Sequence, residues 1–295
     1  MTPRRSPTVR HRRLGQRLRD LRLAAGYTEI AAAAKHAGWS ESKLNRIERA
    51  IGTLPQVANV TVLLDLYGID EADPERDEIL DLTRQARGRG WWRDYQGVMS
   101  EPYATYVGLE AETSKILSFE SEVIPGLLQT EPYFRALMAA RAPETPPEVI
   151  DQLVAVRLRR QQLLTSADPV RLWAIIAEGA LRRLVGGAEV MADQLEHLRK
   201  AAQTPNVTVQ IAPFTAGALP AAGPFSILTF RDRDLDPETV YLETQAGDSY
   251  VTEERQVAAY LRRHEQLIQL GTKYEQTLAM LAALGQQAAT DGDPA

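Results

Sequence analysis

The sequence of 295 residues contains no cysteine, which excludes disulfide bonds, thiolate metal sites and cysteine-based catalysis. It has no apolar run near the roughly 18 residues that a membrane-spanning helix needs, so we expect no membrane among its partners. No apolar segment follows the basic stretch 1–13, so we expect no secretory signal and a cytoplasmic location. Hydrophobic residues make up 44 % of the chain, enough for a sizeable core. At this length, two domains are expected.

Catalytic and metal-binding patterns are also lacking. The histidines are far apart and none has a ligand spacing to a second one: His11, His36, His197 and His264. No phosphate loop, nucleophile elbow or dinucleotide fingerprint occurs. The acidic segment 232–243 matches a calcium-loop pattern except at Pro237, where the turn needs glycine, so we interpret it as an acidic hairpin turn. We therefore predict no catalytic residue, metal or cofactor, and nothing here supports an enzyme with a regulatory arm.

The net charge of −5 is distributed unevenly along the chain. Residues 1–60 contain twelve Lys or Arg and four acids, a net charge of +8, which leaves −13 for the remainder. A basic block attached to an acidic body predicts a polyanion-binding module joined to another domain. For the stretch 4–13 alone, a solvated basic tail is an alternative, and whether this arm touches DNA stays open.

Residues 14–36 have the pattern of two helices. Leucines at near-helical spacing, with arginines between them, predict a first helix with a basic outer face: Leu14, Leu18, Leu21 and Leu23, with Arg17, Arg19 and Arg22. Gly26 is suited to end this helix, and Thr28 to cap a second helix with an alanine-rich body at 30–34.

A third helix is expected over 41–49. Gly38 makes a tight turn before it, Trp39 is a candidate buried anchor, and Ser40 is suited to cap it. Leu44 and Ile47 form its inward face. Two short helices joined by a tight turn are typical of the helix-turn-helix, whose second helix enters the major groove of DNA.

The outward side chains of the third helix are chemically suited to DNA. Asn and Arg pair with adenine and guanine edges, a Glu accepts from a cytosine amine, and a helix N-terminus favours a phosphate. The predicted DNA-binding residues are Arg17, Thr28, Ser40, Glu41, Ser42, Lys43, Asn45, Arg46 and Arg49. An ordinary surface helix of mixed charge is the alternative.

The segment 38–48, GWSESKLNRIE, resembles the W-S-x-S-K-x-x-R-I-E signature of Xre-type (lambda-repressor-like) regulators from high-GC bacteria. The string LLDLYGI at 63–69, within an expected helix over 55–68, is similar to the end of such domains. Three features depart from the pattern, one of which is that the stretch from Thr28 to Trp39 is one residue longer than usual. Glu29 stands where many of these domains have a phosphate-binding Gln, and Gly52 lies later than the usual glycine after the third helix.

Beyond residue 70, an acidic stretch opens a connector helix that we place at 71–90. The adjacent Trp91 and Trp92 are candidates for a pocket or for simple core. A long helix is expected over 101–122, and another after the cap Thr130. Strands rich in β-branched or aromatic residues are expected at 170–177, 207–212, 225–229 and 240–243. A single last helix is expected at about 253–285, with a flexible tail at 286–295.

Several strings in this half resemble a C-terminal domain of unknown function that is fused to Xre-type domains in many high-GC bacteria. The most specific is PGLLQT at 125–130, in which Gln129 is a further candidate for a ligand or partner pocket. Members of the resembled family are often encoded beside a small protein that modulates them. The resemblance therefore implies antitoxin-like regulators and a small protein partner encoded nearby.

These observations define the expected architecture. We predict a mainly α protein: an all-α helix-turn-helix domain at 1–70, the connector at 71–90, and an α+β effector and dimerisation domain at 91–285 with a small sheet and a long final helix. The predicted function is a dimeric transcriptional regulator that binds a double-stranded DNA operator. The alternative is an antitoxin-like protein that mainly holds a small protein partner and uses DNA binding for autoregulation.

Overall fold

The computed structural model describes residues 9–50, 54–86, 91–95, 97–230, 238–244 and 247–291. By its internal contacts the chain divides into unit 1, residues 1–112, and unit 2, residues 113–295. The expected arm before residue 9, Gly52, the end of the connector at 88–90 and the acidic turn at 232–237 lie outside the described residues. Unit 1 is helical: α1 (Val9–Ala24), α2 (Ile30–His36), α3 (Glu41–Glu48), α4 (Val57–Leu66), α5 (Pro74–Ala86), the 3-10 helix η1 (Trp91–Tyr95) and α6 (Glu101–Glu110).

The core of unit 1 is built on one face of α1. Leu14, Leu18 and Leu21 are buried there, as their spacing predicts. Two expectations for this helix are wrong. Leu23 is 44 % exposed because it lies two positions after Leu21, on another face. Arg22 is buried and does not belong to the basic outer face.

Helix α5 packs on α1 and α4, and its Ile79 is buried in the core of unit 1. It begins with acidic residues in its first turn, as expected. The segment that we placed outside the helical domain as a connector is therefore a packed element of unit 1. The reason is its apolar face, which needs a partner in the core.

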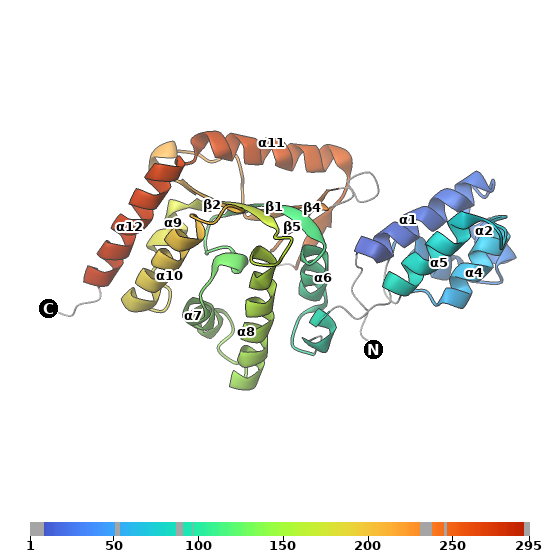
Figure 1. The fold of residues 1–295 in the computed structure, drawn as a ribbon, viewed down its shortest axis with the longest axis horizontal. Coiled ribbons are helices and arrows are strands. Elements are labelled where there is room, and N and C mark those ends of the chain that lie inside the picture. Colours follow the sequence, from blue (N-terminus) through green and yellow to red (C-terminus); the bar gives the residue numbers. More distant parts are fainter. Residues whose placement is uncertain are drawn as a thin grey trace. The chain divides into compact units, whose positions relative to one another are not determined.

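The described part of unit 2 forms one six-stranded mixed sheet (Figure 1). Its order is β3-β2-β1-β4-β5-β6, with β1, β2 and β3 parallel and the remaining pairs antiparallel. The strands are β1 (Thr113–Glu120), β2 (Arg171–Ala177), β3 (Val207–Ala212), β4 (Phe225–Phe230), β5 (Thr239–Leu242) and β6 (Ser249–Val251).

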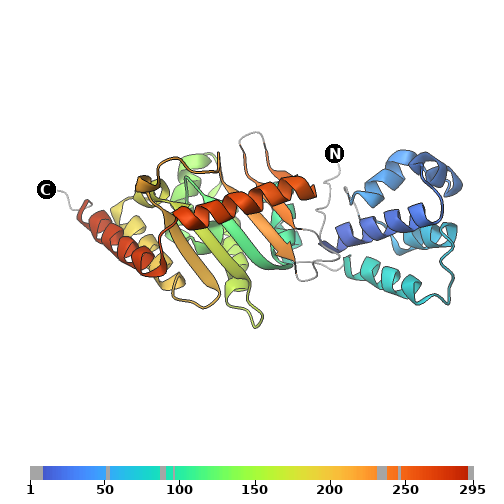
Figure 2. The same ribbon diagram turned by 90° about the horizontal axis from the view of Figure 1, so that it is seen from above.

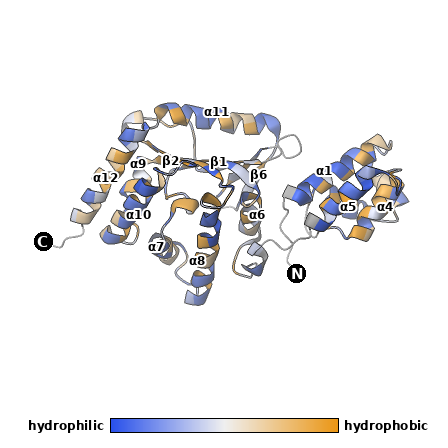
Figure 3. Cartoon of the chain, viewed as in Figure 1, coloured by the Kyte–Doolittle hydropathy of each residue, from blue (hydrophilic) through white to orange (hydrophobic). Residues whose placement is uncertain are grey.

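Helices cover both faces of this sheet. The helices of unit 2 are α7 (Glu131–Arg141), α8 (Pro147–Gln161), α9 (Glu178–Arg182), α10 (Ala188–Ala201), α11 (Glu254–Leu270) and α12 (Tyr274–Asp291), with short 3-10 helices η2 (Gly126–Leu128), η3 (Gln162–Leu164) and η4 (Phe214–Ala216). Helices α7, α8 and α10 lie on one side of the sheet and α11 on the other (Figure 1). Seen from above, α11 runs across the strands (Figure 2). Both hydrophilic and hydrophobic residues occur along it (Figure 3), as one solvated and one packed face require.

The helix expected over 101–122 is wrong in its second half. Helix α6 ends at Glu110 and the chain then forms β1, which pairs with β2 on one side and β4 on the other. Short apolar runs do not distinguish a buried strand from a helix segment. The four strands that we did expect are all present, with bounds that agree within one residue at both ends.

The expected single last helix is two helices. Gly271 ends α11 in an extended conformation, and the Thr272 N–H donates to the Ile211 carbonyl at 2.9 Å. The Thr272 hydroxyl accepts from the Ile211 N–H at 3.0 Å, so the linker covers the edge strand β3. Helix α12 then continues to Asp291 and buries Ala288, so the tail that we placed from residue 286 is helical up to that point.

His264 of α11 is buried against the sheet and gives the fold a measurable pH dependence. Its ring lies edge-on to Trp173 and Phe225, with centroids 6.1 and 6.4 Å away. Burial lowers the pKa of His264 from 6.5 to about 4; a hydrogen bond to the Trp173 backbone opposes this shift and nearby Lys115 adds to it.

We expect the folded protein to lose about 2 kcal/mol of stability through this histidine between pH 7.5 and pH 5. Between pH 6.5 and 4 the unfolded chain binds a proton that the folded protein does not. The contribution is therefore complete above pH 6.5 and is lost as the pH falls. Urea unfolding at both pH values, compared with His264→Met, measures it. Parallel profiles for the two proteins would contradict this assignment.

Candidate DNA-binding surface

Helices α2 and α3 are joined by a tight turn of defined geometry. Gly38 has a φ of +71°, which favours glycine, and the Trp39 N–H donates to the Ala34 carbonyl at 2.8 Å. The Ser40 hydroxyl accepts from the Lys43 N–H at 3.2 Å and so caps α3, as predicted. The cap expected at Thr28 is wrong: Glu29 is the N-cap of α2 and its side chain makes no capping hydrogen bond.

Helix α3 presents its polar residues on the face opposite to its core contacts. Leu44 and Ile47 are buried, and at roughly 100° per residue the opposite direction is occupied by Ser42, Arg46 and Arg49, all exposed. The remaining predicted residues of this helix lie away from the centre of that face: Glu41 is exposed, and Lys43 and Asn45 are half-buried. Trp39, the expected buried anchor, is also half-buried.

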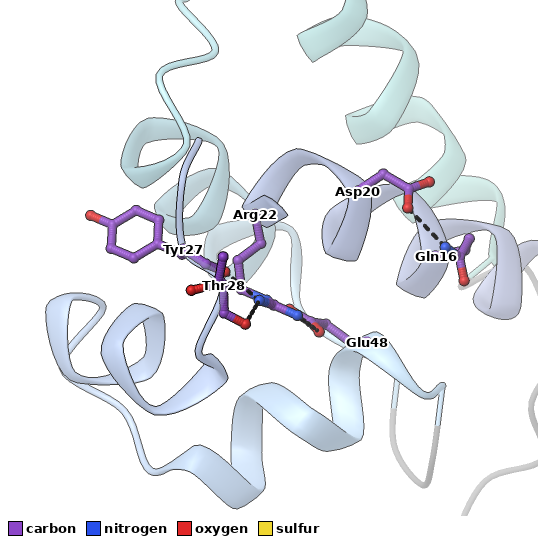
Figure 4. A network of polar contacts seen from close by, with 6 residues as sticks. All are labelled: Gln16, Asp20, Arg22, Tyr27, Thr28 and Glu48. Atoms are coloured by element: carbon purple, nitrogen blue, oxygen red, sulfur yellow. Dashed lines mark hydrogen bonds and ion pairs between the residues drawn. The ribbon is translucent and has the colours of Figure 1, made fainter. Parts of the chain in front are cut away.

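A buried ion pair fixes α3 to α1 (Figure 4). Arg22 donates to both carboxylate oxygens of Glu48, from Nε at 2.7 Å and from Nη2 at 3.1 Å. Its Nη1 donates to the carbonyls of Tyr27 and, at 3.1 Å, Thr28. The hydrogen bonds to Glu48 raise the pKa of Arg22, so the guanidinium stays charged. One side chain thus ties the end of α3 and the α1–α2 loop to the first helix.

Gly15 lets α1 and α3 approach closely. A Cβ atom at this position would lie 2.6 Å from the Glu48 carbonyl oxygen and 2.8 Å from that of Ile47. These atoms belong to the backbone of α3 and cannot turn away as a flexible side chain could. The position of α3 against α1 therefore depends on the absence of a side chain at residue 15.

The other predicted contact residues have identifiable surroundings. Arg17 on α1 forms an ion pair with Glu75 of α5, with the nitrogen and oxygen 2.5 Å apart. Thr28 is exposed and its carbonyl is used by Arg22. The Arg46 guanidinium donates to the Ser42 carbonyl at 3.3 Å, so it folds back along α3.

Lys43 is held between two elements. Its ammonium lies 3.6 Å from the centroid of the Trp39 ring and 3.4 Å from the Asn59 amide oxygen on α4. Sequence reasoning missed the roles of Asn59 and Glu48. No local signal identifies either residue, because both act through contacts with side chains 16 and 26 positions away.

The weaker pocket candidates fall in different units. Trp92 is buried in unit 1, where a Cβ on Gly108 would lie 3.1 Å from its indole, and Trp91 meets it edge-on. Gln129 is buried in unit 2 and its amide donates to the Ile124 carbonyl at 2.6 Å. Each candidate thus takes part in the internal packing of its own unit.

Unit 2 holds the PGLLQT string through side-chain amides. Gln161 of α8 donates to the Gln129 carbonyl at 2.6 Å, and Gln194 of α10 donates to the Leu128 carbonyl at 2.8 Å. Gln194 also accepts from the Thr130 N–H, and Thr130 caps α7 as predicted. Among the described residues, no group of three His, Cys, Asp or Glu is placed to hold a metal ion.

A capped helix after a tight turn, carried on a packed set of helices, defines a helix-turn-helix domain. Residues 13–79 match the family model described as a helix-turn-helix domain. The larger part of the chain, residues 103–283, matches the model of the domain of unknown function DUF5753, and the chain belongs to that family. No curated protein and no solved structure matches the chain. Within the described residues, no helix is both long and apolar enough to cross a membrane.

Proposed function

We propose that this protein is a sequence-specific, DNA-binding transcriptional regulator that acts by binding and not by catalysis. The observation that carries the proposal is the exposed face of α3, where Ser42, Arg46 and Arg49 project away from the core of a helix-turn-helix domain. The second helix of such a motif enters the major groove, where Arg pairs with guanine edges. The net charge of +8 over residues 1–60 favours the approach to a polyanion.

Selection of bound duplexes from a random pool with the full-length protein tests this function. We expect one motif to be enriched and bound at least about a thousandfold more tightly than unselected duplex. Failure to enrich any motif, with equal affinity for all duplexes, would refute sequence-specific binding.

The proposal includes a dimer that reads two half-sites. One helix-turn-helix makes few base contacts, so two copies about 34 Å apart on the duplex are expected. We assign dimerisation and the sensing of a signal to unit 2, because α3 and its supports all lie in unit 1. Light scattering of the full chain and the half-site spacing of the selected motif test the dimer. A monomer that binds a single half-site would refute it.

Arg46→Ala is expected to weaken binding to the selected operator by about 1–3 kcal/mol, or roughly five- to 150-fold. Arg46 is exposed at the centre of the α3 face, and among the described residues its guanidinium is held only by the Ser42 carbonyl of its own helix, so it can extend to a base. A gel-shift titration measures the change. Arg19→Ala is the control, because Arg19 is an exposed residue of α1. Unchanged affinity would exclude Arg46 from the interface.

A further inference from the structure

Lys43 lies at the side of the α3 face and not at its centre. It is one position from Ser42 and three from Arg46, which places it about a quarter turn from the exposed direction of the helix. In agreement, Lys43 is half-buried whereas Ser42 and Arg46 are exposed. A side chain in this place reaches toward α4, where Asn59 meets it.

Two neutral groups position the Lys43 ammonium without neutralising it. The face of the Trp39 ring attracts the cation at 3.6 Å, and the Asn59 amide oxygen accepts from it at 3.4 Å. Neither group carries a negative charge. An ammonium has three N–H donors, so these contacts leave it able to bind an anion.

The chemistry of such a held ammonium suits a phosphate better than a base. Lysine acts as a compact point charge, whereas base edges are discriminated by paired donors and acceptors in a fixed geometry. Phosphate contacts set the register of a protein on DNA and carry no sequence information. A lysine whose side chain is held in one position beside the exposed face of α3 is suited to such a phosphate contact.

We propose that Lys43 binds a backbone phosphate of the DNA and does not read a base, and that Trp39 and Asn59 are the positioning residues that hold its ammonium for this contact. The inference rests on the proposed DNA-binding function and specifies how one part of the surface works. It gives Lys43 and Arg46 different roles, a phosphate contact and a base contact, although both residues lie on α3.

The charge of Lys43 is tested by Lys43→Gln, with Arg46→Ala as the matched variant. For Lys43→Gln we expect the same loss of affinity on the selected operator and on unselected duplex. We also expect the slope of log K against log salt to fall by about 0.9, the value for one phosphate contact. Arg46→Ala should instead reduce the preference for the operator. A changed base preference for Lys43→Gln in a repeated selection, or an unchanged salt slope, would overturn the proposal.

The positioning role is tested by a double-mutant cycle. Asn59→Ala should weaken binding several-fold in the presence of Lys43 and have almost no effect in the Lys43→Gln background, because the residues act together. If the losses of binding free energy caused by Lys43→Gln and Asn59→Ala simply added in the double variant, the two residues would act independently. That result would overturn the positioning role of Asn59.

A measurement on the free protein separates this inference from the proposed function. Ring current from Trp39 should shift the Lys43 Hε resonances upfield, and Trp39→Leu should remove the shift. An absent shift would refute the Trp39–Lys43 contact even in a protein that binds its operator. A protein with the shift that binds no duplex at all would refute the proposed function and, with it, the phosphate contact.

Discussion

Arg22→Met is expected to lower the free energy of unfolding of unit 1 by about 3–5 kcal/mol, because it leaves the Glu48 carboxylate buried without its cationic partner. The Arg22 guanidinium donates one hydrogen bond to each carboxylate oxygen of Glu48. It donates two more to backbone carbonyls of the α1–α2 loop. The loss is thus concentrated in the contacts that hold α3. We also expect operator binding to disappear at temperatures where unit 1 is no longer folded.

Hydrogen exchange of peptides from α1 and α3, measured in the full chain, reports the stability of unit 1. Arg19→Met is the matched control, since Arg19 lies on the same helix and is exposed, and a change within about 0.5 kcal/mol is expected there. The double variant Arg22→Met/Glu48→Leu removes both charges, and we expect it to recover much of the stability. Equal destabilisation by the double and the single variant would show that the lost loop contacts, and not the ion pair, dominate.

This ion pair also shows where sequence reasoning stops. Arg22 stands beside Leu21, in the run of arginines that we interpreted as an outer face, and its charge is compensated inside the protein by the long-range contact with Glu48. A charge is buried when a partner compensates it, and a partner 26 residues away has no local signature. Periodicity therefore predicted the burial of Leu14, Leu18 and Leu21, but it did not predict which arginine is buried.

The strands of the sheet show the same difference between local signals and long-range contacts. Strands β2, β3, β4 and β5 were predicted from β-branched and aromatic content within each segment. Strand β1 lies at the middle of the sheet between β2 and β4, and its conformation depends on pairing with residues more than fifty positions away. The break at Gly271 has a local signal, because glycine is favoured where a helix ends, but the extended linker after it depends on the pairing of Thr272 with β3.

For the candidate DNA-binding surface, the sequence predicted the turn and the cap of α3 and the inward face of this helix, but not the start of α2, where Glu29 and not Thr28 is the N-cap. Gly38, Ser40, Leu44 and Ile47 have the roles that their residue types indicate, since turns and caps are local structures. The contacts that hold Lys43 at the side of this face could not be predicted in this way, because α4 supplies Asn59 from outside the motif.

Gly15→Ala is expected to destabilise unit 1 by about 1–3 kcal/mol, although alanine is favoured over glycine inside a helix by about 1 kcal/mol. The added Cβ would lie 2.6 Å from the Glu48 carbonyl oxygen, so α1 and α3 must move apart. Base contacts need placement within about 0.5 Å, and we therefore expect operator affinity to fall about tenfold or more. Gly285→Ala is the control, because its Cβ would meet Leu195 at an ordinary 3.9 Å and should stabilise α12. Urea unfolding and operator titration of both variants measure these effects, and a Gly15→Ala protein with the stability and affinity of the parent would contradict the close approach of α1 and α3.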